Sequence, residues 1–156
     1  MKTNERLKET LSGHLQGGKA FMPVEEMLKK MRFDKLGVLP NHLPYSFYML
    51  FYHMWFTQKD ILNYCLQKDY SAPVWPTDYW PNKKSPENEE EWKGLQTAFF
   101  EDREALSNLL ISSELSDYVP SNERHIIFRE ILLVIEHSAY HSGQLLIILR
   151  QLGLHS

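Results

Sequence analysis

The segment FYMLFYHMWF, residues 47–56, constrains the fold of this chain most, because every residue in it except His53 is apolar or aromatic. Such a segment belongs in a protein core, and it is well short of the roughly 20 apolar residues that a membrane-spanning helix needs. Amphipathic spacing continues after it. We therefore predict a long buried helix from Pro44 or Tyr45 to about Gln67 that carries one histidine inside the protein.

A second histidine-bearing helix is predicted near the C-terminus, where His137 and His141 stand four residues apart in an aliphatic pattern. Four residues advance an α-helix by about 400°, so both imidazoles leave the same face about one turn apart. This helix is predicted to start at a Ser121 cap and to end at Leu152, a length of about 48 Å. We hypothesise that the two imidazoles meet His53 and that the three side chains hold one divalent metal ion with at least one open coordination position.

Apolar residues at helical spacing predict three further helices. They cover Asn4–Gln16, a short segment that starts after Pro23, and a segment from a Ser85 cap and Pro86 to about Ile111. Gly17 and Gly18 suit the left-handed cap that ends the first of these helices. No segment alternates apolar and polar residues well enough to predict a β-strand.

Residues 68–85 contain three prolines and four tyrosine or tryptophan residues, so they cannot form one continuous helix. Two interpretations of this aromatic loop stay open: it closes over a pocket as a lid, or it simply packs on the helices. The whole chain is predicted to be all-α. We expect a single domain over residues 1–156, a four-helix bundle with one short extra helix and the aromatic loop as a crossover connection.

Charge and cysteine content exclude several classes of function. A net charge of −3 without a cluster of lysine or arginine gives no basic face for a nucleic-acid backbone. Cys65 is the only cysteine, so no intramolecular disulfide can form, and no segment resembles a secretion signal. We expect a cytoplasmic protein that binds a small-molecule substrate and neither nucleic acid nor a membrane.

Three neutral imidazoles, with a water molecule completing the shell, suit Zn²⁺, and nickel or iron would also accept them. Without partners, each buried imidazole would cost about 1–3 kcal/mol, so hydrogen bonds or a metal must satisfy it. Cys65 lies about 120° from His53 around its helix, which argues against a cysteine ligand.

Other polar residues are candidates for contacts with the metal ligands. Gln144, Glu130 and Asp60 each lie on the helical stripe of a ligand, although each could equally face solvent or a neighbouring helix. The remaining histidines are expected to be surface residues: His14, His42, His125 and His155.

Several segments carry a family resemblance. They are MPVEEML after the glycine pair, LPYSFYMLFYHMWFTQKDILNYC, DYWP, EEWKGLQTAFFEDREAL and REILLVIEHSAYHSGQLLIILRQLG. Their order along the chain and their residue patterns resemble those of the DinB/YfiT-like superfamily of metal-dependent four-helix-bundle proteins. The resemblance implies that His53, His137 and His141 are the metal ligands, and that the reaction is either transfer that uses a low-molecular-weight thiol or hydrolysis. Together with the surplus of aromatic residues, it also leads us to expect a homodimer. Many relatives have a glycine-rich stretch where this chain has PSNERHIIF, so the rim of the site and the substrate are expected to differ.

Two functions are compatible with such a site. The first is an enzyme, a metal-dependent thiol S-transferase or hydrolase that uses zinc or nickel, with iron as a further option. The second is a non-catalytic bundle in which the metal is structural or supports a binding surface. A di-iron carboxylate site is disfavoured, because it requires paired Glu-x-x-His motifs, which the relevant helices lack.

Overall fold

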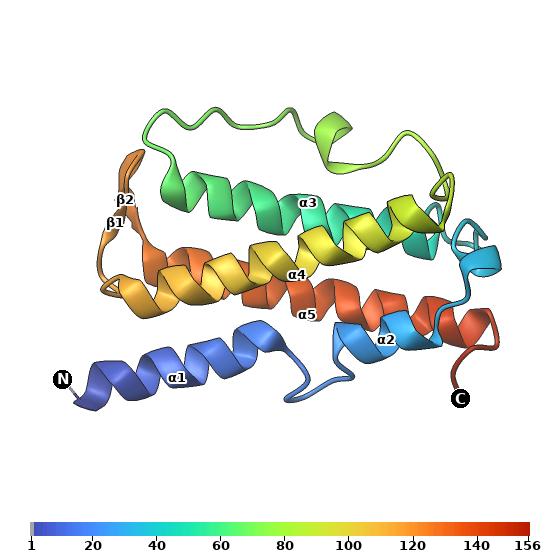
Figure 1. Ribbon diagram of the computed structural model, residues 1–156, viewed down its shortest axis with the longest axis horizontal. Helices are drawn as coiled ribbons and strands as arrows, with labels where there is room; N and C mark the ends of the chain where they lie inside the picture. Colours follow the sequence, from blue (N-terminus) through green and yellow to red (C-terminus); the bar gives the residue numbers. More distant parts are fainter. Residues whose placement is uncertain (1) are drawn as a thin grey trace.

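The computed structural model describes residues 2–156, and this part of the chain is mostly helical, with five α-helices and one two-stranded hairpin (Figure 1). The helices are α1 (Lys2–Gln16), α2 (Val24–Lys30), α3 (Phe47–Leu66), α4 (Glu89–Ser112) and α5 (Ile127–Gln151). The strands are β1 (Tyr118–Val119) and β2 (Asn122–Ile126), and 3-10 turns cover Phe33–Lys35 and Thr77–Tyr79. Each predicted helix is present, and Gly17 and Gly18 have positive φ angles of 81° and 76°, as the cap prediction requires.

The three long helices pack against one another, α1 packs against both α4 and α5, and α2 packs against α5. Figure 1 shows α3 and α4 running in the same direction, with the crossover loop, residues 67–88, returning along the outer side of α3. Helix α5 runs the opposite way, and α1 and α2 follow one another along it. By length and composition α5 would also be long enough to cross a membrane, and in this structure it contacts all four other helices.

The core has two hydrophobic clusters, one toward each end of the long helices. The first centres on Phe47, Phe51 and Phe99, and the second includes Leu15, Leu106 and Leu110; all six side chains are at most 1% exposed. Because burying a large apolar side chain contributes about 1.5–3 kcal/mol, these clusters supply most of the driving force for the packing.

A buried polar layer separates the two clusters. The Arg103 guanidinium, which is 3% exposed, donates from Nε to the Gln58 amide oxygen and from Nη2 to the Ser138 hydroxyl, both at 2.9 Å. It also lies 4.5 Å from the centre of the Phe99 ring, in cation–π geometry. The Gln58 amide nitrogen in turn donates to the Phe99 carbonyl at 2.8 Å. Burial lowers the pKa of Arg103 to about 10, so the guanidinium remains charged at neutral pH.

The start of the last helix was predicted wrongly. Residues 122–126, expected in its first turns, form β2, which pairs antiparallel with β1. This small hairpin was not predicted, but the mostly helical chain remains consistent with the predicted all-α class. Helix α5 begins at Ile127 without a side-chain cap. Its first amides are satisfied by backbone instead, because Ile127 N–H donates to the Asp117 carbonyl at 2.9 Å and Phe128 N–H to the Leu115 carbonyl at 3.0 Å.

The predicted start of α4 is also displaced. The cap is Asn88 rather than Ser85, and its side-chain oxygen accepts from the Glu91 amide at 2.9 Å. Ser85 packs against Gly37 instead, where an added Cβ on the glycine would come within 2.7 Å of the serine Cβ. Three acidic residues, Glu89 to Glu91, follow this cap in the first turn, where they suit the helix dipole.

The buried core predicts a sharp contrast between two leucines. Replacing fully buried Leu106 with alanine is expected to lower the free energy of unfolding by about 2–5 kcal/mol, because the space it leaves cannot be refilled. The matched change Leu66→Ala, at a side chain that is 55% exposed, should change the free energy of unfolding by about 0.5 kcal/mol or less. Urea unfolding of both variants measures these free energies, and equal losses would contradict the assigned core.

Candidate metal centre

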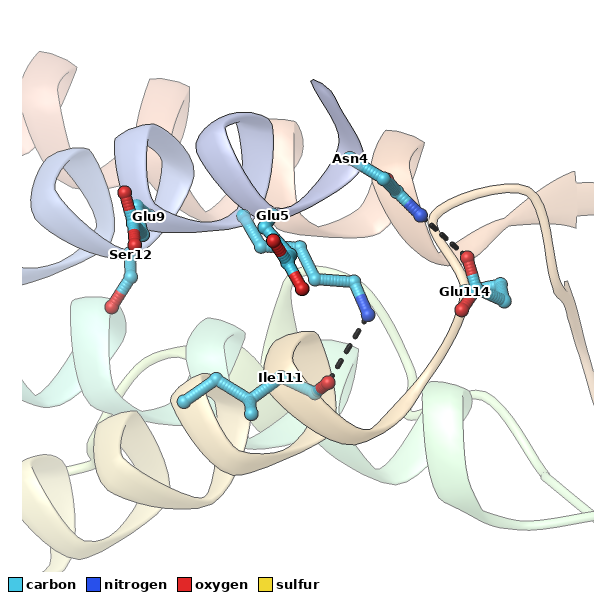
Figure 2. Close-up of a pocket in the computed structure, with 7 residues that line it drawn as sticks. Asn4, Glu5, Glu9, Ser12, Ile111 and Glu114 are labelled. Atoms are coloured by element: carbon cyan, nitrogen blue, oxygen red, sulfur yellow. Dashed lines mark hydrogen bonds between the residues drawn. The ribbon is translucent and has the colours of Figure 1, made fainter. Parts of the chain in front are cut away.

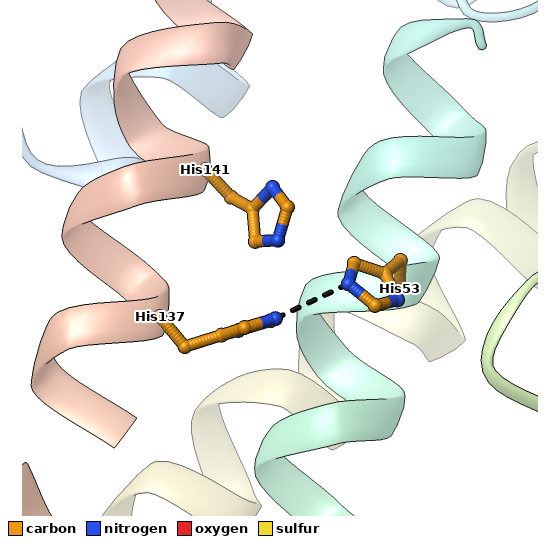
Figure 3. A group of neighbouring side chains, drawn as sticks. All are labelled: His53, His137 and His141. Atoms are coloured by element: carbon orange, nitrogen blue, oxygen red, sulfur yellow. Dashed lines mark hydrogen bonds between the residues drawn. The ribbon is translucent and has the colours of Figure 1, made fainter. Parts of the chain in front are cut away.

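Three histidines from two helices converge in the middle of the structure. His53 comes from α3, and His137 and His141 come from α5. One ligand nitrogen from each lies within 4.8 Å of the others, and the Nε2 atoms of His53 and His137 are 3.1 Å apart. Figure 3 shows the three rings turned toward one another across the gap between the helices. The predicted convergence of residues distant in sequence is confirmed.

Hydrogen bonds fix which nitrogen of two rings is free to bind a metal. His53 Nδ1 lies 3.2 Å from the Tyr79 carbonyl oxygen, and His141 Nδ1 lies 2.5 Å from the Gln144 amide oxygen. Both oxygens can only accept, so each Nδ1 carries the hydrogen and each Nε2 keeps its lone pair. This is the arrangement in which metal-binding histidines are usually held by a partner on the second ring nitrogen.

The spacing of the imidazoles also fits one ion. Two nitrogens bound at 2.0–2.1 Å to a tetrahedral zinc ion lie about 3.3 Å apart, close to the separation between the Nε2 atoms of His53 and His137. His53 and His141 are only 3% and 8% exposed, and His137 is partly buried. The donor set, its orientation and its spacing therefore all fit a single divalent metal ion.

Burial keeps all three rings neutral. It lowers the pKa of His53 to about 4, aided by the nearby His141 and opposed by the hydrogen bond to Tyr79. It lowers the pKa of His137 to about 3, aided by both other imidazoles. The pKa of His141 is also lowered by burial, against the opposing effect of Gln144. Neutral imidazole is the form that binds a metal, so no proton has to leave at neutral pH.

The crossover loop packs directly on these histidines. The Trp80 ring is parallel to the His53 ring, with centroids 4.3 Å apart, and the Trp75 ring lies 6.0 Å from it, edge to face. Tyr79 adds the carbonyl that orients His53. The loop thus forms a wall of the site. Sequence reasoning missed the role of Tyr79, because a backbone carbonyl leaves no side-chain signature.

The three predicted contact residues lie in different places. Gln144 contacts His141, as described above. Asp60 instead accepts hydrogen bonds from the hydroxyls of Tyr70 and Tyr79, at 2.7 and 2.6 Å. Glu130, only 2% exposed, pairs with Arg129. Asp60 therefore reaches the histidines only through Tyr79, and Glu130 serves a separate ion pair.

His125, expected on the surface, is instead half-enclosed. Its Nδ1 lies 2.7 Å from the Tyr64 hydroxyl, and it lines a hollow of about 320 Å³ together with Asp60 and Glu130. The segment PSNERHIIF therefore contributes to this hollow through His125, while the described contacts of the triad come from α3, α5 and the crossover loop. Cys65 is buried in the second hydrophobic cluster, in keeping with its predicted exclusion from the metal ligands.

A larger hollow of about 750 Å³ lies between α1 and the end of α4, and none of the three histidines lines it (Figure 2). Two hydrogen bonds join groups of its lining: Lys8 Nζ donates to the Ile111 carbonyl at 3.1 Å, and the Asn4 amide donates to Glu114 at 2.5 Å. These are exposed surface contacts that need no ligand. The triad is the better candidate site, because buried, converging lone pairs do need one.

Three neutral imidazoles are the donor set of several catalytic zinc sites, in which the remaining coordination position takes water or substrate. Comparison of the chain with protein-family models, curated proteins and solved structures gives no match. The arrangement can bind one divalent ion and present it to a small molecule.

The lowered histidine pKa values predict acid sensitivity of the metal-free protein. Between pH 6.5 and about 4 the unfolded chain takes up protons at these imidazoles while the folded chain does not, so the free energy of unfolding falls as pH falls through this range. Urea unfolding in the presence of a chelator at pH 7, 6 and 5 measures the loss. The decrease should be smaller in His137→Gln; an equal decrease would contradict burial of that imidazole.

Gln144 is expected to control metal affinity. Gln144→Leu removes the acceptor that holds the hydrogen on His141 Nδ1, and loss of such a partner typically weakens metal binding about 10- to 100-fold. Chelator competition with zinc measures the affinity. Gln151→Leu, an exposed glutamine at the end of the same helix, serves as the matched control and should bind zinc like the wild type. Equal affinities in the two variants would show that the Gln144 contact does not matter.

Proposed function

We propose that this protein is an enzyme that uses one divalent metal ion, zinc or nickel with iron as a further option, held by His53, His137 and His141. One observation carries the proposal: three imidazole nitrogens lie within 4.8 Å of one another, and two of the rings are held with the free lone pair on Nε2. A closed structural zinc site would normally use four protein ligands, whereas three leave a position for substrate.

The proposed reaction is transfer to a low-molecular-weight thiol, or hydrolysis. A divalent metal, when bound, is a Lewis acid that lowers the pKa of a coordinated water or thiol. The chain's own residues preorganise the site: Tyr79 and Gln144 orient two ligands, and Trp80 covers one face of His53. The resemblance of the segments around these histidines to DinB/YfiT-like proteins supports both the reaction class and a four-helix bundle with one short extra helix.

A structural role for the metal is the second candidate. His53 lies on α3, the other two ligands lie on α5, and Tyr79 ties His53 to the crossover loop. A bound ion would therefore link three segments that are distant in the sequence. In that case the metal would stabilise the fold without turnover.

Metal analysis of protein purified without added metal tests the proposal. We expect about one divalent ion per chain, because the three imidazoles form a single site. His137→Ala should lose the ion, while His14→Ala, at an exposed histidine outside the triad, should keep it. Absence of metal even after incubation with zinc and nickel would contradict the proposal.

Turnover separates the two candidates on the same samples. The metal-loaded protein is screened for conjugation of small thiols to electrophiles and for hydrolysis of simple esters and amides. Activity that disappears in His137→Ala and persists in His14→Ala supports the enzyme. Loss of metal with a melting temperature lower by many degrees and no turnover in either protein supports the structural role.

A further inference from the structure

Four aromatic side chains, Tyr45, Trp75, Trp80 and Tyr140, form a collar around the histidine cluster. Trp80 stacks on His53 with ring centres 4.3 Å apart, and Tyr45 stacks on Trp80 at 5.9 Å. Trp75 approaches His53 at 6.0 Å, and Tyr140 approaches His141 at 4.9 Å, both edge to face. Aromatic groups from the crossover loop, from the connection before α3 and from α5 thus pack on the imidazole rings of the cluster or on one another.

Two members of the collar are unusually exposed for their size. Trp75 and Tyr140 are each 65% exposed, although the rings they touch belong to buried or half-buried histidines. Aromatic side chains grouped around a few converging polar groups are the composition of ligand sites, so these two exposed rings are candidates for ligand contacts. Their rings offer apolar faces at little cost in conformational entropy, which is why tyrosine and tryptophan dominate many binding surfaces.

The collar carries no formal charge at neutral pH. Its members are two indoles and two phenols. Burial, with a smaller contribution from Tyr140, raises the pKa of the Tyr45 hydroxyl, so this phenol stays neutral at neutral pH. A ligand held here would place its uncharged part among rings, because a charged group would lose solvation without gaining a partner.

We propose that the collar is the binding site for the uncharged aromatic part of a ligand whose donor atom binds the metal. This inference rests on the proposed metal site and specifies its substrate class: small molecules that join an apolar ring to a compact metal-binding group. Trp75 and Tyr140 contact the ring of the ligand, while Trp80 and Tyr45 form the floor behind them. Selectivity between substrates then comes from the ring rather than from ion pairs.

Two hydroxamic acids that differ in their apolar part test the proposal. Acetohydroxamic acid offers only the metal-binding group, and benzohydroxamic acid adds a phenyl ring. Their dissociation constants for the zinc-loaded protein are measured by calorimetry and corrected for their affinities for free zinc. The phenyl compound should bind about tenfold more tightly, as two aromatic contacts allow.

Variants assign the preference to the collar. The preference is expressed as the dissociation constant of acetohydroxamic acid divided by that of benzohydroxamic acid. Trp75→Ala and Tyr140→Ala should each reduce this ratio several-fold without changing the binding of acetohydroxamic acid, with metal content checked in every sample. Tyr118→Ala, which removes a tyrosine of similar exposure (60%) on β1, should leave the ratio unchanged. A variant that loads less zinc is compared after saturation with zinc, so that the ratio still reports on the ring.

The outcomes separate the collar from the metal site. Tight binding of acetohydroxamic acid with no preference for the phenyl compound would overturn the collar proposal and leave the open metal site intact. An unchanged ratio in both collar variants would also overturn it. Failure of both compounds to bind zinc-loaded protein would reject the open coordination position, and with it both proposals.

Discussion

Burial of three imidazoles between α3 and α5 is the constraint on which the rest of the structure depends. An imidazole taken out of water must find a partner for each nitrogen, and the Tyr79 carbonyl and Gln144 amide supply two of these partners. These hydrogen bonds and the close approach of the three rings determine which faces of α3 and α5 meet at the histidine cluster. The crossover loop returns over α3, and this path brings the Tyr79 carbonyl to His53.

A second buried polar group, the Arg103 guanidinium, lies in the interior away from the histidines. Arg103 lies between the two hydrophobic clusters and relies on Gln58, Ser138 and the Phe99 ring rather than on a carboxylate. A buried guanidinium without an opposite charge is costly, and each of its hydrogen bonds is correspondingly important. The long helices are thus held in register by polar contacts whose geometry is specific, while the apolar clusters on either side supply the bulk of the burial energy.

The parts of the fold that depend on side-chain periodicity could be predicted from the sequence. His53 in an otherwise apolar helix and the four-residue spacing of His137 and His141 were enough to predict that the three imidazoles meet. The positive φ angles at Gly17 and Gly18 were predictable for a similar reason, since few other residues tolerate them.

Features that depend on backbone contacts could not be predicted in this way. Helix α5 starts at Ile127 because carbonyls of the preceding connection cap it, and no residue type signals such a cap. The same holds for the Tyr79 carbonyl at His53. Asp60 and Glu130 were predicted to lie on the helical stripes of the ligands. In the folded chain their carboxylates bind other groups: Asp60 accepts from two tyrosine hydroxyls, and Glu130 pairs with Arg129.

Tyr79 belongs to two networks at once, since its carbonyl accepts from His53 and its hydroxyl donates to Asp60. If the triad binds a metal ion as proposed, its occupancy and the ordering of residues 67–88 are thermodynamically coupled, and the coupling is reciprocal. An ion that bound more tightly when this chain segment is docked would also stabilise the docked segment by the same free energy. The crossover loop would then modulate metal affinity from within the chain, and a substitution at Asp60 or Tyr70 would alter His53 without contacting it.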